Sequence, residues 1–369
     1  MSNKLRALAI HLPQFHPIPE NDEWWGKGFT EWTNVAKTAP RFDGHYQPHL
    51  PSDLGFYDLR VKESRIAQAE MAKEYGISGF CYYHYWFNGR QVLETPVKEI
   101  LKSKEPDFPF CLCWANENWT RNWDGMFNDV LLEQKYSTED DINHIRFLFQ
   151  FFEDKRYITV DEKPVFIVYR TELFPDIKKT ADVWREEAVK AGFKGLYLIR
   201  CENFNTDVDP KSIGFDASFN FFPNHYGMPL YIIPGKLEQW LHKLGIKKSP
   251  YLEDLIWNYS DIVDKQINNP QTVSYKRFPG ITPMWDNSAR RKKNAMILKD
   301  STPEEYGRWL KHIIDSFKPF SSEENFIFIN AWNEWAEGNH LEPCQKWGRR
   351  YLEVTREVIL QKLQTNHEK

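Results

Sequence analysis

The sequence predicts a closed (β/α)8 barrel, an α/β TIM-barrel fold, formed by one domain over residues 1–369. Eight short runs rich in apolar, β-branched and aromatic residues alternate with longer amphipathic stretches, as strands and helices do in such a barrel. An open doubly wound sheet is the alternative. The absence of a G-x-G-x-x-G or P-loop sequence after any of these runs favours the barrel.

The expected elements follow one another along the whole chain. In 138–154, for example, Ile142, Ile145 and Phe149 recur at the three- and four-residue spacing of a helix face. The expected strands cover 5–11, 77–85, 109–115, 163–169, 195–201, 215–221, 278–285 and 325–332. The expected helices cover 61–75, 91–103, 138–154, 177–191, 209–213, 250–268, 302–318 and 347–363.

Two connections are too long to be ordinary turns. They cover residues 12–60, after the first expected strand, and 222–249, after the sixth. Because both follow strands, the barrel fold places both long loops at the C-terminal face, where active sites lie. We therefore expect both loops over the mouth of the barrel.

Composition excludes several classes of function. The chain has 48 Lys and Arg against 52 Asp and Glu, which argues against nucleic acid as a partner. Mean hydropathy is −0.64, and no apolar run approaches the ~20 residues that span a bilayer. The apolar run 5–10 is too short for a signal peptide, so we expect a cytoplasmic protein. Five scattered cysteines indicate reduced, structural thiols: Cys81, Cys111, Cys113, Cys201 and Cys344.

Aromatic residues make up 16% of the chain and include 15 Trp. Many of the Trp lie beside His, Asn and Glu, which suits a ligand with apolar faces and many hydrogen-bonding groups, such as a sugar. An aromatic-rich core explains the composition equally well. Composition alone leaves these two interpretations open.

Polar and aromatic residues gather where the expected strands end, and in a barrel those ends converge on one site. Each residue alone is compatible with a structural role: any one of the Trp could belong to the core, and Asp286 could cap the segment that follows it. Their recurrence across strands favours a substrate site. The expected substrate-binding residues are His11, His84, Trp86, Asn116, Glu117, Trp119, Tyr169, Trp285, Asp286, Asn287, Arg290 and Trp335.

Glu334 and Glu337 are the expected catalytic pair. Glu334 lies between Trp332 and Trp335, and Glu337 follows three residues later, at the end of the last expected strand. Like charges held close together and partly desolvated acquire different pKa values, which leaves one acid and one base. Glycosidic-bond cleavage needs such a pair. A surface turn or a helix cap is the structural alternative.

Six long segments of the sequence are distinctive: LPQFHPIPENDEWWGKGFTEW (12–32), GHYQPHLPSDLGFYDLR (44–60), GFCYYHYWFNG (79–89), WANENWTRNWDG (114–125), PGITPMWDNSARR (279–291) and NAWNEWAEGNHLEP (330–343). They resemble the WbsX-type family, which is associated with surface-polysaccharide gene clusters, and the resemblance covers nearly the whole chain. A thinner resemblance to the endo-α-mannosidases of glycoside hydrolase family ninety-nine rests on the barrel plan, on 53–57, on the seventh-strand region around Asn287 and Arg290, and on N-E-W-x-E-G at 333–338.

The resemblance to the endomannosidases implies a role for each glutamate. Glu334 would take the proton of the substrate's 2-hydroxyl, whose oxygen then attacks C1 to give a 1,2-anhydro sugar, and Glu337 would act as acid and then as base. Ala336 stands where endomannosidases tend to have a larger polar residue, which affects substrate identity more than the chemistry.

No cofactor or metal is expected. No H-x-x-x-H or H-E-x-x-H spacing occurs on an expected helix. Asp207-Val208-Asp209 has the D-x-D pattern of metal-binding nucleotide-sugar transferases, but it precedes Pro210, where an aspartate is an ordinary helix cap.

Three functions remain open. The first is a retaining glycoside hydrolase acting on an oligo- or polysaccharide with α-manno configuration, such as one containing mannose or rhamnose. The second is a glycosyltransferase or transglycosylase of O-antigen or capsule assembly. The third is a polysaccharide-binding protein without catalysis, which the presence of both carboxylates disfavours.

Overall fold

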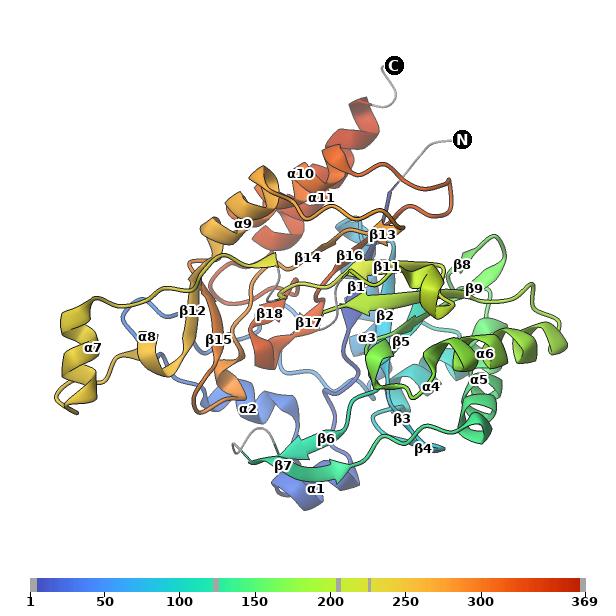
Figure 1. Cartoon of the computed structure of the whole chain (residues 1–369), viewed down its shortest axis with the longest axis horizontal. Helices are drawn as coiled ribbons and strands as arrows, with labels where there is room; N and C mark the ends of the chain where they lie inside the picture. The colour runs from blue at the N-terminus through green and yellow to red at the C-terminus, as the bar shows by residue number, and fades with distance from the viewer. Residues whose placement is uncertain (1–4, 122–125, 204–206, 225–226, 366–369) are drawn as a thin grey trace.

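The computed structural model describes residues 5–121, 126–203, 207–224 and 227–365 (Figure 1). Its main sheet is a nearly closed barrel of parallel strands, which confirms the predicted fold. The bounds of each expected strand lie within three residues of those of an observed strand, except for the seventh. Seven barrel positions are formed by β1 (Arg6–His11), β2 (Gly79–His84), β5 (Phe110–Trp114), β9 (Lys163–Val168), β10 (Tyr197–Glu202), β11 (Ala217–Asn220) and β16 (Phe326–Ile329).

The seventh position is divided, where the sequence had predicted one strand over 278–285. β13 (Arg277–Phe278) pairs with β11, and β14 (Gly280–Ile281) pairs with β16, so the chain changes partner at Pro279. A Cβ on Gly280 would lie 1.6 Å from the carbonyl oxygen of Asn220 on β11. Glycine is therefore required where these two backbones approach and the barrel closes.

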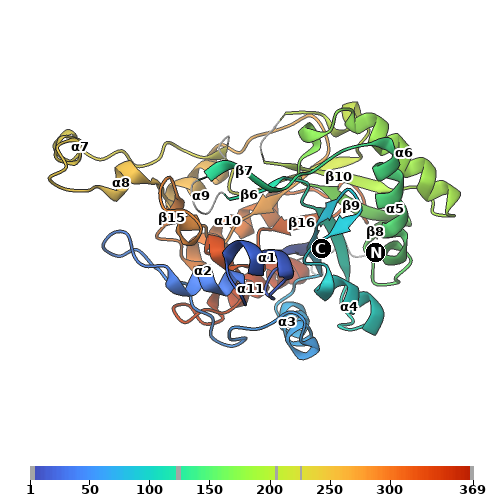
Figure 2. The ribbon, with the colours of Figure 1, turned by 90° about the horizontal axis from the view of Figure 1, so that it is seen from below.

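Helices surround the barrel, and most begin and end near their predicted bounds (Figures 1 and 2). The expected helix 250–268 is wrong in its middle, because Leu255–Asn258 forms a strand, β12, parallel to β15 (Met296–Lys299). The apolar Ile256 and Trp257 fit a buried strand as well as a helix. The helices are α3 (Lys62–Glu74), α4 (Thr95–Ser103), α5 (Thr138–Phe152), α6 (Ile177–Lys190), η3 (Pro210–Ile213), α8 (Pro250–Glu253), α9 (Tyr259–Asn268), α10 (Pro303–Ser316) and α11 (Arg350–Thr365).

The two long connections contain elements of their own. The first contains α1 (Pro19–Trp25) and α2 (Glu31–Lys37). The second contains α7 (Lys236–Lys243), which projects away from the barrel and does not cover its mouth (Figures 1 and 2). Short hairpins follow three of the strands: β3 (Trp86–Phe87) with β4 (Arg90–Gln91), β6 (Trp119–Arg121) with β7 (Met126–Leu132), and β17 (Asn333–Glu334) with β18 (Asn339–His340). β8 (Thr159–Val160) pairs with the start of β9.

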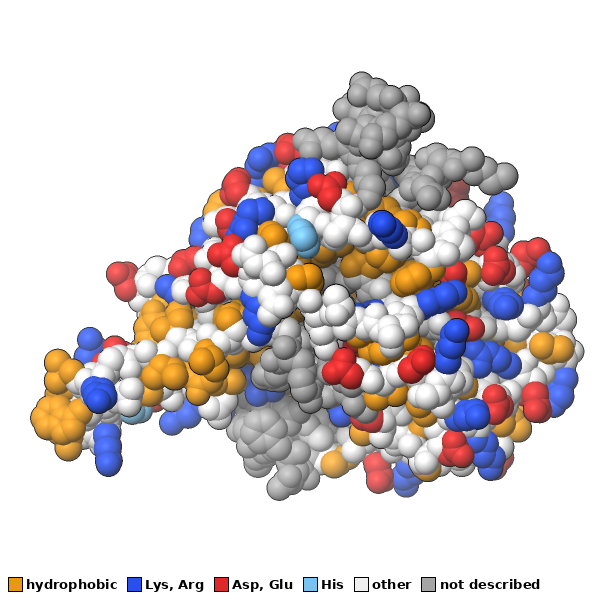
Figure 3. Space-filling view, turned by 45° about the horizontal axis from the view of Figure 1, so that its top comes forward, with side chains coloured by type: hydrophobic (Ala, Val, Ile, Leu, Met, Phe, Trp, Pro, Cys, Tyr) orange, Lys and Arg blue, Asp and Glu red, His pale blue; other side chains and the backbone are white. Residues whose placement is uncertain are grey.

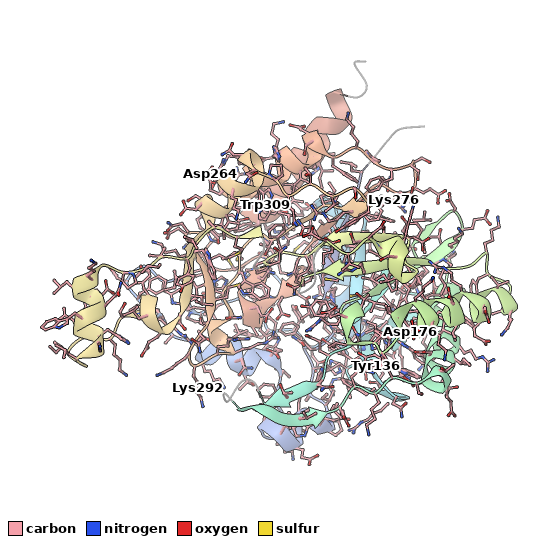
Figure 4. All side chains as sticks on the ribbon, in the orientation of Figure 1. Tyr136, Asp176, Asp264, Lys276, Lys292 and Trp309 are labelled. Carbon is pink, nitrogen blue, oxygen red and sulfur yellow. The ribbon has the colours of Figure 1, made fainter. Side chains whose placement is uncertain are left out.

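The barrel interior is a packed core. Side chains of the central strands are almost completely buried, and sticks fill the space between the ribbons (Figure 4). All five cysteines are buried free thiols, as the sequence predicted. Among the described residues no helix is long and apolar enough to cross a membrane.

Candidate active site

A cavity of about 540 Å³ lies at the C-terminal ends of the barrel strands. That volume is typical of sites for small ligands. Residues at or shortly after the end of each barrel strand line it, and α1, α2 and the β6–β7 hairpin also contribute to the lining. The strand-end residues that line it include Leu12, Tyr83, Ala115, Tyr169, Asn203, Phe221, Trp285 and Asn330.

Glu334 and Glu337 both line this cavity. Glu334 ends β17, Glu337 ends the short helix η6 (Trp335–Glu337), and β18 returns the chain antiparallel to β17. The neighbouring Asn333 is completely buried and joins this turn to β1: its Oδ1 accepts from the Leu12 amide at 2.8 Å, and its Nδ2 donates to the Leu12 carbonyl at 3.0 Å. Two opposed hydrogen bonds hold the loop in one position relative to the barrel.

Arg290 joins three carboxylates at the floor of the cavity. Its Nη2 lies 3.0 Å from Oε1 of Glu334, and its Nη1 lies 3.0 Å from Oε1 of Glu337. Glu31, from α2, lies 3.3 Å from Nη2 and is 4% exposed. The Arg290 side chain is 14% exposed, so these charges interact in a largely dry environment. One guanidinium therefore fixes both candidate catalytic groups.

The electrostatics favour a proton on this pair. Burial raises the pKa of Glu334 well above its ordinary value, and the Glu337 carboxylate raises it further, while Arg290 opposes both effects. Burial also raises the pKa of Glu337, again against Arg290. Burial lowers the pKa of Arg290, but Glu31, Glu334 and Glu337 outweigh it and leave that pKa well above the ordinary value. The arginine stays charged while the two carboxyls compete for protons.

Aromatic rings form much of the cavity wall. Trp24 and Trp119 meet edge to face, with ring centroids 6.0 Å apart, and Trp119 also contacts Tyr85 at 5.3 Å. Trp285 and Tyr169 lie on the barrel side of the same cavity. Apolar ring faces beside carboxylates and amides suit a ligand that has C–H faces and hydroxyl groups.

Half of the expected substrate-binding residues line the cavity, and the other half lie elsewhere. Those that line it are Glu117, Trp119, Tyr169, Trp285, Asn287 and Arg290.

His11, His84 and Trp86 are buried in other contacts. His11 Nε2 lies 3.1 Å from Oε1 of Gln68, and the ring nitrogens of His84 and His144 lie 2.9 Å apart. Burial lowers the pKa of His11 and of His84 to about 3, so both rings are neutral. Trp86 donates from Nε1 to a carboxylate on α5. These side chains lie beneath or beside the cavity because the strand residues bearing them face the barrel interior or the helix layer.

Asn116, Asp286 and Trp335 also hold the surrounding structure together. Asn116 accepts from the amide of Arg170 and donates to its carbonyl, both at 2.8 Å, which ties the end of β5 to β9. Asp286 accepts from His45 and from the amide of Ser288 and so caps η5 (Asn287–Ala289), the structural role that the sequence had left open.

Trp335 belongs to a buried network behind the loop. It stacks on His340 with centroids 3.8 Å apart and donates from Nε1 to Glu342 at 2.6 Å. Glu342 also accepts from Tyr57 and Gln68, and burial raises its pKa to about 7. This network supports the loop that carries Glu334 and Glu337.

Sequence reasoning missed several cavity residues. Glu31 was overlooked although it stands in the F-T-E-W part of a WbsX-like segment, and Trp24 and Trp25 stand in the same segment. Arg170 lines the cavity and pairs with Glu117. The signal for Trp24, Trp25 and Glu31 was present in the long first loop, but only the fold shows which part of that loop turns inward.

A second cavity of about 380 Å³ adjoins the first, between α2 and residues 288–292. The two cavities share Trp25, Arg290 and Arg291 in their linings. Lys37 of α2 and Lys292 lie on the second one, and Figure 4 shows Lys292 at the edge of the molecule on the side of α2. An extended ligand has room to continue past Arg290.

Among the described residues, no group of three or more His, Cys, Asp or Glu side chains is arranged to hold a metal ion. The two aspartates of the D-x-D pattern do not line the cavity. Asp209 caps η3 by accepting from the amide of Lys211 at 2.9 Å, and Asp207 accepts from Gln271. The helix-capping role therefore accounts for Asp209.

Fold and site together define a (β/α)8-barrel protein whose cavity, at the C-terminal ends of the strands, contains paired glutamates held by one arginine. The family model described as "Glycosyltransferase WbsX" matches residues 7–355. The chain belongs to this family.

Two curated relatives, both named uncharacterized protein WxcX, come from two strains of Xanthomonas campestris pv. campestris. Each is 40% identical over 353 residues, which is 95% of this chain and 49% of the relative. The chain thus spans about half the length of the curated relatives it matches.

Solved structures share the fold at low sequence identity. The glycoside hydrolase family ninety-nine endo-α-mannosidase of Bacteroides thetaiotaomicron, in complex with bis-tris propane, gives a TM-score of 0.59 at 13% identity and covers 100% of both chains. A structure described as a glycoside hydrolase-like protein gives 0.57 at 12% identity, over 97% of this chain and 94% of the other.

Proposed function

We propose that this protein is a retaining glycoside hydrolase that cleaves linkages of α-manno-configured sugars, such as mannose or rhamnose, within an oligo- or polysaccharide. The observation that carries the proposal is the pair Glu334 and Glu337, held 3.0 Å from the two amino groups of Arg290 in an aromatic-walled cavity. The shared fold of the endo-α-mannosidase structure supports the sugar configuration.

The proposed reaction uses the substrate's own 2-hydroxyl. Glu334 takes the proton of that hydroxyl as its oxygen attacks C1, and Glu337 gives a proton to the leaving glycosidic oxygen. The product of this step is a 1,2-anhydro sugar. Glu337, now ionised, then takes a proton from water as the water oxygen attacks C1, and Glu334 returns its proton to the 2-oxygen. Two inversions at C1 give net retention.

The charge balance of the site supports one shared proton. With Arg290 between them, the two carboxyls can hold one negative charge and one proton, which the first step requires. In the free site, Glu334 is the more shielded of the two: its side chain is 6% exposed, against 22% for Glu337. Glu337 therefore has better access than Glu334 to a leaving group and to water.

The experiment compares Glu337→Gln with Glu334→Gln on two α-mannosyl substrates that differ only in leaving group. General acid–base assistance contributes about 10²–10⁴ in rate, so both variants should lose that much on a substrate with a poor leaving group. A fluoride leaving group needs no proton, and it should restore most of the activity of Glu337→Gln but not of Glu334→Gln. Glu304→Gln, at an exposed carboxylate, is the matched control.

Three outcomes contradict parts of the proposal. If the fluoride restores Glu334→Gln instead, the roles of the two glutamates are reversed. If the wild type cleaves a 2-deoxy substrate normally, the 2-hydroxyl takes no part. If both variants fold and retain the wild-type rate, the hydrolase proposal fails.

The second candidate function is glycosyl transfer, which the description of the family model favours. In that case we propose that the protein takes part in O-antigen or capsule assembly. It predicts product only when a nucleotide sugar and an acceptor are both present, whereas hydrolysis needs neither. The third candidate, a polysaccharide-binding protein without catalysis, predicts that polysaccharide binds but is neither hydrolysed nor extended.

A further inference from the structure

An arm formed by residues 229–252 projects from the barrel and ends in α7 (Figures 1 and 2). Its base is attached firmly. Trp257 Nε1 donates to the carbonyl of Pro229 at 2.9 Å, the amide of Ile232 donates to Ile256 at 2.7 Å, and Ile232 packs against the cluster around β12 and β15. The arm is therefore a defined extension of the fold.

An apolar stripe runs along α7 and faces solvent. Leu237, Trp240, Leu241 and Leu244 recur at the i, i+3, i+4, i+7 spacing of one helix face, which in a globular protein normally packs on the core. No residue of α7 is buried. Leu237 is 69% exposed, Trp240 56% and Leu244 53%.

Hydrogen bonds within the arm keep this stripe in place. Ser249 donates its hydroxyl to Glu238 and its amide to Nδ1 of His242, which closes the segment after the helix back onto it. Gln239 donates to the carbonyl of Pro234 at 2.8 Å. The arm thus holds the stripe on a helix none of whose described residues is buried.

The arm also carries much of the exposed apolar surface of the molecule. Eight of the fifteen exposed large hydrophobic side chains among the described residues lie in it, including Leu230 at 88% and Ile246 at 66%. Figure 3 shows hydrophobic side chains along the arm and at its tip, with Lys or Arg side chains beside them. A contiguous apolar patch of this kind marks an interaction surface.

The charges of the arm indicate its partner. Lys236, Lys243, Lys247 and Lys248 are all exposed, in a chain whose net charge is −4. Glu238, which accepts from Ser249, is the only acidic residue between 229 and 252, and Glu253 follows at the base of the arm. Lysines beside Leu and Trp on a short amphipathic helix are typical of helices that lie in the interface of an anionic bilayer.

We propose that the arm binds an anionic lipid surface, inserting the apolar stripe of α7 between headgroups that neutralise the four lysines. Pairing of two arms from two copies of this chain would instead bring eight lysines together against two glutamates, which charge repulsion disfavours. The bilayer supplies both an apolar phase and negative charge. This surface lies apart from the cavity, and the proposal does not depend on which reaction the cavity performs.

The test measures sedimentation of the full chain with phosphatidylcholine vesicles that contain or lack phosphatidylglycerol. We expect binding only to the anionic vesicles, weakened by salt. Trp240→Glu should weaken binding by at least about tenfold, because it places a charge in the apolar stripe. Lys247→Gln should weaken it by about fivefold, the effect of one basic residue near such a surface.

Val189→Glu is the matched control, since Val189 is 59% exposed on α6 and should not touch the membrane. Activity on a dissolved substrate should be the same for the wild type and Trp240→Glu, which separates this proposal from the proposed function. Absence of binding to the anionic vesicles, or equal loss in Trp240→Glu and Val189→Glu, would overturn the proposal. So would a dimer that Trp240→Glu dissociates in the absence of any vesicle binding, which would assign the arm to self-association.

Discussion

Replacing Arg290 by Gln tests the electrostatic centre of the site. Arg290 contacts Glu31, Glu334 and Glu337 at 3.0 to 3.3 Å, and its side chain is only 14% exposed. Removing one partner of a buried ion pair costs about 3–5 kcal/mol, since it leaves uncompensated charge in a dry environment. We expect Arg290→Gln to lose that much free energy of unfolding at pH 8.

The loss should depend on pH. Arg290 lowers the pKa of Glu334 and of Glu337, so in the variant both pKa values rise further above those of the unfolded chain. The folded variant then binds more protons than its unfolded state, and stability falls as pH rises. Each additional carboxyl that is protonated only in the folded state contributes a slope of about 1.4 kcal/mol per pH unit. The deficit relative to wild type should therefore be smaller at pH 5 than at pH 8.

Urea unfolding at both pH values measures this difference, and the pH profile of kcat/KM is the second readout. Because a base must be ionised to act, the acidic limb of that profile should move to higher pH in Arg290→Gln. Arg291→Gln is the control: Arg291 also borders the cavity, but it forms no ion pair with any residue in the described part of the chain, and it lowers the pKa of Glu337 less than Arg290 does. We expect it to change stability by less than about 0.5 kcal/mol. An equal deficit at pH 5 and pH 8, or equal effects of the two variants, would refute the reasoning.

Two further predictions follow from single residues, and a third from the side chains of the described residues, which form no metal-binding group. Gly280→Ala should destabilise by about 3 kcal/mol, measured by urea midpoint, because its Cβ meets the Asn220 carbonyl, whereas Gly235→Ala, with open space around it, should cost far less. Burial raises the pKa of Glu342 to about 7, so between about pH 4.3 and 7 the folded state binds a proton that the unfolded chain lacks. The contribution of Glu342 to the free energy of unfolding therefore falls by about 4 kcal/mol across that range as pH rises. Glu342→Gln should abolish this fall, and parallel stability curves would contradict the assignment. Chelator treatment should leave activity on a cleavable substrate unchanged, and loss with rescue by a divalent ion would favour the transferase.

Much of the architecture was predictable because it depends on local pattern. Alternation of short apolar runs with amphipathic stretches specifies strands and helices, and their order specifies a parallel sheet. The pattern failed where the same residues are compatible with either a strand or a helix. Ile256 and Trp257 suit a buried strand or a buried helix, and only pairing with β15 decides between them.

The residues of the candidate site also fall into those that the sequence predicts and those that it does not. The pair Glu334 and Glu337 was visible because both residues lie within one short segment. His11 and His84 had the same sequence signal, a polar residue at a strand end, yet their side chains turn toward Gln68 and His144. Period-two alternation tells which residues share a face of a strand, but it does not tell which face borders the cavity at the last residue.

What the sequence by itself determined is the order of elements, the carboxylate pair and the aromatic richness, all of which depend on neighbours along the chain. Only the tertiary structure decided that Glu31 and Arg290, 259 positions apart, lie 3.3 Å from each other, and that α7 leaves its apolar stripe uncovered. Amphipathic spacing predicts that a helix has an apolar face, but whether a core lies opposite that face depends on where the rest of the chain packs. Likewise, an ion pair between distant loops exists only after barrel closure has brought their ends together.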